Sequence, residues 1–387
     1  MEDIYHKIRR YIDENRSGMM ALWEELVNTE SGSRQLEGLE RVLNILRREM
    51  VRSGMETRTV AMENAGDVLI GEWNRESGAA PILFIGHMDT VFQEGAATEN
   101  PFRVDQDGRA HGPGVLDMKA GLVIALYAVR ALADAGYQKR PVKCVFVGDE
   151  ENLHMFSSAK EIIAGEAAGA VAAFNFETGY PDDGLVTGRK GGGIIDVTVH
   201  GVPSHSGIAP EKGRSAVLEM AQKIIEIESR NDIARGKLMN CGMIKGGIGE
   251  NTVPGECQIN IGIRFPTTAI RDEILSDIRA AADTVHVADT TAEVQVRMLM
   301  ECMEETSGVL ALFEHTRKTA LECGYGEVYP MTVSGVSDSG VAVISGVPTV
   351  CAMGVKGEGN HTKEEYAQVE SLFSRAVLAA SAVYTLE

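Results

Sequence analysis

Cysteine is scarce in this sequence and shows neither a disulfide pattern nor a metal-binding pattern. The 387 residues include six cysteines, which lie far apart and form no C-x-x-C pair. A cysteine-based zinc module needs clustered cysteines, and a disulfide-stapled secreted domain needs a denser set. We therefore expect free thiols and a location in the reducing cytoplasm.

Long apolar runs and positive charge are also lacking. No stretch approaches the ~18 uninterrupted apolar residues of a membrane-spanning helix, and the opening MEDIYHKIRR has no signal-peptide core. The 37 basic residues face 56 acidic ones, and the net charge of −19 argues against nucleic-acid or anionic-membrane partners. Hydrophobic residues nevertheless make up 44% of the chain. A soluble protein of two domains is expected.

Helix and strand patterns alternate at both ends of the chain. Apolar residues at helical spacing predict a helix over 39–50, ended by Gly54, and further helices over 120–136, 308–323 and 372–384. Strand patterns cover 56–60, 67–72, 81–85, 141–148, 170–176 and 349–353. This alternation predicts an α/β domain with a mainly parallel sheet flanked by helices.

The middle of the chain has a different order. Strands are expected over 194–200, 238–244, 256–264 and 292–299, with helices over 215–228 and 269–282. This β-α-β-β-α-β order is that of a ferredoxin-like α+β domain. The glycines of TGRKGGG, residues 187–193, are expected to form a hinge into it. We predict one domain from 1–187 and 301–387, with residues 188–300 inserted as a second domain.

Polar side chains lie directly after predicted strands or in the loops between predicted elements. Open α/β sheets place functional groups at the carboxyl ends of their strands. These residues are His87, Asp89, Asp117, Glu150, Glu151, Glu177 and His361, and Asp149 directly precedes Glu150. Each alone has an ordinary explanation, such as helix capping by Asp117 or a solvated turn at residues 149–151. Their coincidence favours a zinc pair, because imidazole and carboxylate suit zinc and a catalytic site keeps a position for water.

The motifs GHMDTV, GRAHGPGVLDMKAG, GDEEN, FNFETG, VPSHSG and NHTKEE occur in this order along the chain. Together they resemble the M20 metallopeptidases, and most of all their glutamate carboxypeptidase (carboxypeptidase G2-like) branch. The resemblance covers nearly the whole chain. It implies a zinc-exopeptidase-type α/β domain at 1–187 and 301–387, with residues 188–300 as a mobile lid and dimerisation domain.

The same resemblance implies a metal centre of two zinc ions, with Co²⁺ or Mn²⁺ as alternatives. Asp117 would bridge the two ions. One ion would take His87 and Glu177, and the other would take Glu151 and His361.

The resemblance also assigns residues around the metals. Asp89 would accept a hydrogen bond from the His87 ring and fix its tautomer. Glu150 would be the general base. His205, in SHSG, would stabilise the oxyanion in the partner subunit's site, although a solvated loop histidine is the ordinary alternative.

Two further residues would contact the substrate by resemblance. Arg264 would bind its carboxylate, or else be a surface arginine at a strand end. Asn251 would lie near the substrate, or else be a turn residue. GVSDSG, around Asp338, resembles a loop that lines the pocket.

We therefore predict a dizinc hydrolase that cleaves the amide bond before a terminal amino acid, a carboxypeptidase with glutamate as the preferred leaving group. Small peptides or N-acyl amino acids would be its substrates, and a homodimer would form through the lid. An N-acyl-amino-acid deacylase, a dipeptidase or aminopeptidase, and a carbamoyl-type amidohydrolase remain alternatives. A non-catalytic metal-binding scaffold is the alternative from another class. Glu150 argues against a scaffold, because binding alone needs no base.

Overall fold

The computed structural model describes residues 4–387, which divide into two compact units. The larger unit holds the residues up to Gly188 together with Glu305–Val333 and Ser337–Glu387. The smaller unit holds Arg189–Glu304 and Ser334–Val336. None of the helices in the described residues combines the length and apolarity of a bilayer span.

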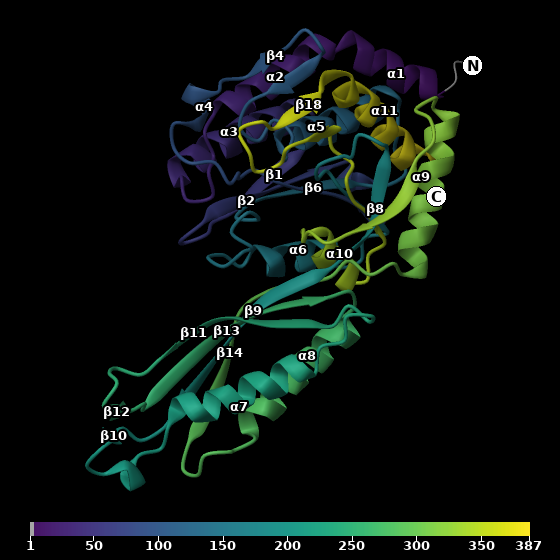
Figure 1. Cartoon of the computed structure of the whole chain (residues 1–387). Coiled ribbons are helices and arrows are strands. Elements are labelled where there is room, and N and C mark those ends of the chain that lie inside the picture. The colour runs from purple at the N-terminus through teal and green to yellow at the C-terminus, as the bar shows by residue number, and fades with distance from the viewer. Residues whose placement is uncertain (1–3) are drawn as a thin grey trace. The chain divides into compact units, whose positions relative to one another are not determined.

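The larger unit is an α/β structure with one six-stranded sheet (Figure 1). Its helices are α1 (Ile4–Glu14), α2 (Arg16–Asn28), α3 (Leu36–Arg52), α4 (Ala96–Glu99), α5 (Lys119–Asp134), α6 (Ala159–Ala167), α9 (Ser307–Glu322), α10 (Ser339–Ile344) and α11 (Val369–Thr385). The sheet contains β1 (Glu56–Val60), β2 (Gly66–Trp73), β6 (Val142–Gly148), β3 (Ile82–His87), β7 (Ala172–Asn175) and β16 (Thr349–Val350), in this spatial order. Short strands form two further sheets: β8 (Gly184–Arg189) with β15 (Tyr329–Val333), and β4 (Arg103–Val104), β5 (Arg109–His111), β17 (Gly357–Glu358) and β18 (Tyr366–Gln368).

The central sheet is mainly parallel, as the alternating pattern predicts. Strands β6, β3, β7 and β16 run parallel, while β1 and β2 form an antiparallel edge. Strand β3 is buried along its whole length and serves both faces. Ile82 and Phe84 belong to the core under α5 and α11, and Leu83 and Ile85 belong to the core under α6 and α10. Successive side chains of a strand point to opposite faces, so a continuous apolar run is what a sheet covered on both sides requires.

Helix α5 positions the loop that carries Asp117. It lies beside α11, and 13 of its 16 residues are buried (Figure 1). Gly121, in its first turn, lies so close to the end of β7 that an added Cβ would be 2.0 Å from the Phe176 carbonyl oxygen. A residue without a side chain therefore lets the start of α5 approach the segment that leads to Glu177.

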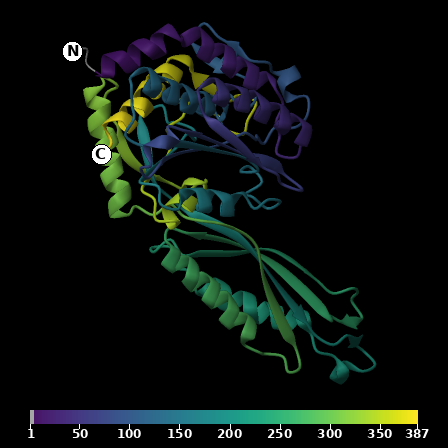
Figure 2. The same ribbon diagram turned by 180° about the vertical axis from the view of Figure 1, so that it is seen from behind.

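The smaller unit is a four-stranded antiparallel sheet with two helices on one face (Figure 2). Its elements are β9 (Gly191–His200), β10 (Ser204–His205), α7 (Ala216–Ser229), β11 (Leu238–Gly246), β12 (Thr252–Val253), β13 (Glu256–Phe265), α8 (Thr268–Asp283) and β14 (Thr291–Met300). The sheet order is β11-β13-β9-β14, and β10 pairs with β12 outside it. Apart from this small ribbon, the element order is the β-α-β-β-α-β order expected from the sequence.

The glycines expected to form a hinge loop lie in strands instead. Gly188 belongs to β8 and Gly191–Gly193 to β9. The reason is close packing, because a Cβ on Gly191 would lie 2.1 Å from the Phe265 ring and one on Gly193 would lie 2.8 Å from the Met298 carbonyl oxygen. Glycine in a strand often marks such a close approach, so these glycines do not form a separate connecting loop.

Candidate metal centre

Three neighbouring parallel strands deliver polar residues to one edge of the central sheet. His87 is the last residue of β3, Asp149 directly follows β6, and Glu177 follows β7 by two positions. Strands β6 and β7 both pair with β3 in parallel, so their carboxyl ends meet at that edge. Functional groups of open α/β sheets lie there.

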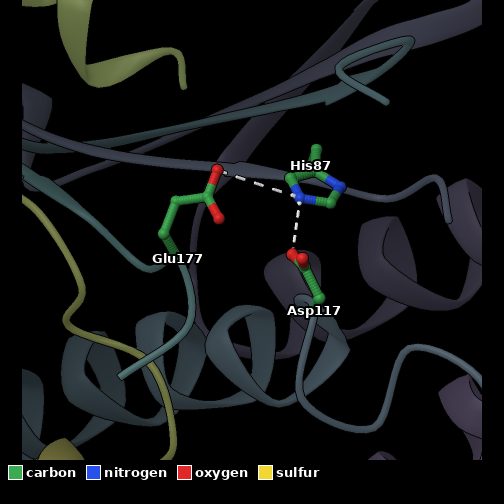
Figure 3. Close-up of side chains that lie close together, drawn as sticks. All are labelled: His87, Asp117 and Glu177. Carbon is green, nitrogen blue, oxygen red and sulfur yellow. Dashed lines mark hydrogen bonds and ion pairs between the residues drawn. The ribbon is translucent and has the colours of Figure 1, made fainter. Parts of the chain in front are cut away.

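The first group of possible metal ligands is His87, Asp117 and Glu177, and all three are buried. Their side chains point toward one another from β3, from the loop before α5 and from the end of β7 (Figure 3). The His87 Nε2 lies 3.2 Å from Asp117 Oδ1 and 3.9 Å from Glu177 Oε1.

The second group is Asp117, Glu151 and His361. The His361 Nε2 lies 3.3 Å from Asp117 Oδ2 and 3.3 Å from Glu151 Oε2. Asp117 therefore belongs to both groups and turns one carboxylate oxygen to each histidine. Asn360, which the sequence analysis did not select, donates from its Nδ2 to Asp117 Oδ2 at 2.9 Å.

Asp89 holds the loop that carries Glu150 and Glu151. Its carboxylate is fully buried and accepts hydrogen bonds from the Glu150 N–H at 3.2 Å, the Glu151 N–H at 3.0 Å and the Ser33 hydroxyl at 2.8 Å. The His87 Nδ1 lies 3.0 Å from the main-chain oxygen of Asp89 and 3.4 Å from its carboxylate Oδ1. The partner of the ring is Asp89, as the resemblance implies, but the nearest acceptor is its carbonyl group.

Glu365 is a buried carboxyl that the sequence analysis passed over, although it lies in NHTKEE. Its Oε1 accepts hydrogen bonds from the Leu116 N–H at 2.7 Å and the Asp117 N–H at 3.0 Å. Burial, together with the charge of Asp117, raises the pKa of Glu365 to about 8. These bonds fix the main chain on which Asp117 stands.

The centre attracts positive charge. Hydrogen bonds to Asp117 and Glu151 raise the pKa of His361 to about 10. The Glu151 Oε1 is buried and has no hydrogen-bond partner among the described residues. Two imidazoles and three carboxylates, one of them shared and one with an unused buried oxygen, suit a pair of zinc ions. The residues that are present therefore fit the metal pair.

Glu150 lies next to these groups but belongs to neither of them. It follows β6 by two positions, and its side chain is buried. Burial and the negative charge of Glu177 raise its pKa well above the ordinary value, against the opposing effect of His87. A carboxyl group in this environment has gained affinity for a proton, as a general base requires.

A buried histidine–aspartate pair outside the two ligand groups was missed in the sequence analysis. Its histidine follows the acidic loop, residues 149–151, in the chain. His154, three residues after Glu151, contacts Asp338 Oδ1 through its Nε2 at 2.6 Å. Asp338 directly precedes α10. The pair thus ties the turn after the acidic loop to α10. GVSDSG pointed to Asp338, but nothing in the sequence pointed to His154.

The other three predicted residues lie in the smaller unit. His205 pairs with Thr252 between β10 and β12, and the Ser206 N–H donates to the Asn251 carbonyl at 2.9 Å. The structure thus brings His205 and Asn251 together. Strand β13 begins at Glu256, close to β12 in the chain. Arg264 lies near the other end of β13. Eight residue steps along a strand separate these ends by roughly 25 Å.

Comparison with known proteins agrees with this geometry. The model of peptidase family M20/M25/M40 matches residues 83–385. This chain belongs to the M20 family. Carboxypeptidase G2 of Pseudomonas sp. (strain RS-16) is 27% identical over 94% of this chain and 88% of its own. Acetylornithine deacetylase of Myxococcus xanthus is 28% identical over 60% of this chain and 66% of its own.

Among solved structures, aminopeptidase PepT from Bacillus cereus ATCC 10987 superposes with a TM-score of 0.75 at 22% identity, over 96% of this chain and 98% of that one. At this identity the likeness concerns the fold. The M20 match and its named hydrolase relatives make this chain an enzyme, a metallopeptidase or amidohydrolase of the M20 family.

Proposed function

We propose that this protein is a dizinc hydrolase that releases a terminal amino acid from a small peptide or an N-acyl amino acid. The observation that carries the proposal is the sharing of Asp117 between two ligand groups, with the buried Glu150 next to them. The larger unit would be the catalytic domain, and the smaller unit would be the lid and dimerisation domain. A cytoplasmic location is proposed from the six cysteines, which are all free thiols.

His87 and Glu177 would hold one ion, Glu151 and His361 would hold the other, and Asp117 would bridge them. Zinc is proposed first because the ligands are imidazole and carboxylate, with Co²⁺ or Mn²⁺ as alternatives. When bound, two such metals lower the pKa of a shared water and polarise the carbonyl of the scissile amide.

Glu150 would accept the proton of the attacking water and deliver it to the leaving amine. Its raised pKa supports this role, because a general base must have affinity for the proton that it accepts. Asp89 would keep Glu150 in place through the hydrogen bond to its N–H. His87 would be held in one orientation by the same residue.

We propose that His205 donates a hydrogen bond to the oxyanion, that Arg264 pairs with a substrate carboxylate and that Asn251 lies near the substrate. Along β13 the end that carries Arg264 is roughly 25 Å from the end near His205. Both residues could therefore serve one substrate only if they came from two chains, which supports the proposal of a homodimer through the smaller unit.

The proposed substrate preference is that of a glutamate-releasing carboxypeptidase. The similarity to carboxypeptidase G2 over 94% of this chain supports it. An N-acyl-amino-acid deacylase is the second candidate, favoured by the similarity to acetylornithine deacetylase, and a dipeptidase is the third.

The test is amino-acid release by the zinc-loaded protein from an N-acylated peptide ending in glutamate, from N-acetylornithine and from a dipeptide with a free amine. The Glu150→Gln variant is the blank, with its metal content measured by mass spectrometry. We expect release from the acylated peptide and a variant that keeps its metals but loses nearly all turnover. Release from the free dipeptide alone would move the enzyme to the dipeptidases. Near-normal turnover by the variant would remove Glu150 from the role of base.

A further inference from the structure

A pocket of about 240 Å³ adjoins the second ligand group within the larger unit. Glu151 and Asn152 line it on one side, and the segments Gly32–Gln35 and Thr90–Gln93 line the rest. Glu151 is also a member of the group with Asp117 and His361. The pocket and the ligand group therefore have Glu151 in common.

The pocket contains one acidic and one basic residue, Glu151 and Arg34. Glu151 faces His361, so its charge is engaged in the ligand group. Arg34 is exposed, and its side chain forms no ion pair or hydrogen bond with any residue from 4 to 387. Its guanidinium carbon lies 5.4 Å from the centre of the Phe156 ring.

Contact with an aromatic ring leaves the donors of an arginine available. The ring attracts the guanidinium and restricts its motion, but it accepts none of the in-plane N–H hydrogen bonds. By contrast, Arg48 and Arg130 in the same unit are engaged by Glu25 and Glu49. In a chain of net charge −19, an arginine with free donors beside an acidic centre is an available anion receptor.

The segment that carries Arg34 is held rigidly. Ser33 donates to the Asp89 carboxylate at 2.8 Å, and its N–H donates to the Thr90 carbonyl at 3.1 Å. Gly32 approaches Phe92 so closely that an added Cβ would lie 2.3 Å from its carbonyl oxygen. The same carboxylate of Asp89 holds Glu151, so the base of Arg34 and the ligand group share one support.

We propose that Arg34 binds a carboxylate of the substrate in this pocket and thereby determines specificity for an anionic substrate. The proposal rests on the proposed function and adds a second cation to it, distinct from Arg264. Arginine suits this role because its planar fork matches a carboxylate with two parallel hydrogen bonds. Gln93 and Asn152 also line the pocket.

Three carboxylates of such substrates share this chemistry: the α-carboxylate, an acidic side chain of the leaving amino acid, and an acidic acyl group. Four ligands separate them. N-acetyl-L-alanine carries only the α-carboxylate, and N-acetyl-L-glutamate carries an acidic side chain as well. N-acetyl-L-glutamine replaces that side chain by a neutral amide. N-succinyl-L-alanine carries the α-carboxylate and an acidic acyl group.

Binding is measured by calorimetry on zinc-loaded Glu150→Gln protein, which should retain ligands without cleaving them, with and without Arg34→Gln. We expect Arg34→Gln to raise Kd by about 10- to 100-fold for at least one ligand, as loss of a charge-assisted hydrogen bond does. A rise in Kd for all four ligands would identify the α-carboxylate as the group that Arg34 binds. A rise in Kd for N-acetyl-L-glutamate alone would identify the acidic side chain. A rise in Kd for N-succinyl-L-alanine alone would identify the acyl group.

Arg34→Lys, which keeps the charge, should recover part of the affinity. Arg75→Gln is the matched control, because it removes another exposed guanidinium, which pairs with the exposed Glu56. In the enzyme with Glu150 intact, Arg34→Gln should raise KM and change kcat little. A Kd change below twofold for all four ligands would overturn the proposal.

The outcomes also separate this proposal from the proposed function. Arg34-dependent binding by a protein that hydrolyses none of the ligands would support the pocket and contradict the hydrolase. Hydrolysis that does not depend on Arg34 would support the hydrolase and contradict the role of Arg34 in the pocket. Metal content and circular dichroism of each variant identify a general loss of structure.

Discussion

Removal of the imidazole of His154 should destabilise the larger unit strongly. The side chains of His154 and Asp338 are 0% and 3% exposed, and their contact of 2.6 Å joins the turn after the acidic loop to the start of α10. The Asp338 Oδ2 has no hydrogen-bond partner among the described residues. In His154→Ala the Asp338 carboxylate would therefore be buried with neither oxygen paired to a side chain.

The magnitude follows from this burial. Breaking a buried ion pair by removal of one partner costs about 3–5 kcal/mol, because it leaves an uncompensated charge. We expect that loss in the free energy of unfolding for His154→Ala, and a smaller loss for Asp338→Asn, which keeps an acceptor for the imidazole. The double variant His154→Ala/Asp338→Ala should lose less than the sum of its single variants, by roughly 1–3 kcal/mol.

The assay is urea unfolding followed by tryptophan fluorescence. Both tryptophans of the chain, Trp23 and Trp73, lie in the larger unit, so the signal reports that unit alone. The transition midpoint should fall with an unchanged slope. A loss below about 1 kcal/mol, or single-variant effects that add within about 0.5 kcal/mol, would refute the reasoning.

The pair also predicts a pH dependence. Burial opposes the charged imidazole, but Asp338, with smaller effects of Asp89 and Asp149, outweighs it and raises the pKa of His154. A histidine whose folded pKa is raised stabilises the fold fully below its unfolded pKa of about 6.5. That contribution is lost as pH rises through the folded pKa. The stability difference between wild type and His154→Ala should therefore shrink from pH 6 toward alkaline pH, and a difference that grew would contradict this sign.

Three further predictions concern the site and its support. Asp117→Asn should reduce zinc below two ions per chain, because both ligand groups share this carboxylate, and retention of both ions by mass spectrometry would contradict the sharing. His205→Ala should lower kcat by roughly 10²–10³-fold, as loss of an oxyanion donor does, whereas an effect on KM alone would make it a binding residue. Gly121→Ala should cost about 1–3 kcal/mol in urea unfolding, because its Cβ would meet the Phe176 carbonyl oxygen at 2.0 Å, and an unchanged midpoint would show that α5 shifts freely.

Much of the larger unit could be predicted from local pattern. The strand at 56–60 matches β1 (Glu56–Val60) in both bounds, and the apolar run before His87 is β3. Strand β3 is buried on both faces and is a continuous apolar run, which makes it visible without tertiary information. This reason does not extend to β1, none of whose residues is buried. The expected strand at 349–353 is shorter, Thr349–Val350, because an apolar run does not reveal how many of its residues find a partner strand.

The glycines at 191–193 mark the limit of that approach. Glycine is permissive in turns and in strands where another group comes close, and the sequence cannot separate the two cases. Phe265 and Met298, which lie close to these glycines, are more than 70 residues away in the chain. Only the pairing of β9 with β13 and β14 brings them there.

By itself the sequence identified candidate metal ligands. His87, Glu151 and Glu177 follow apolar strands whose ends meet in a parallel sheet, whereas Asp117 and His361 lie in loops and were assigned as ligands by the resemblance. The tertiary structure decided how they combine. It turned the two oxygens of Asp117 toward different histidines. It also placed the Asp89 carboxylate where it accepts hydrogen bonds from the main-chain N–H groups of Glu150 and Glu151. It also placed Glu365 behind Asp117, and it left the Arg34 donors without a hydrogen-bond partner among residues 4–387. Such features depend on contacts between segments that are distant in the chain. No local sequence pattern encodes which hydrogen-bond partner a side chain will have.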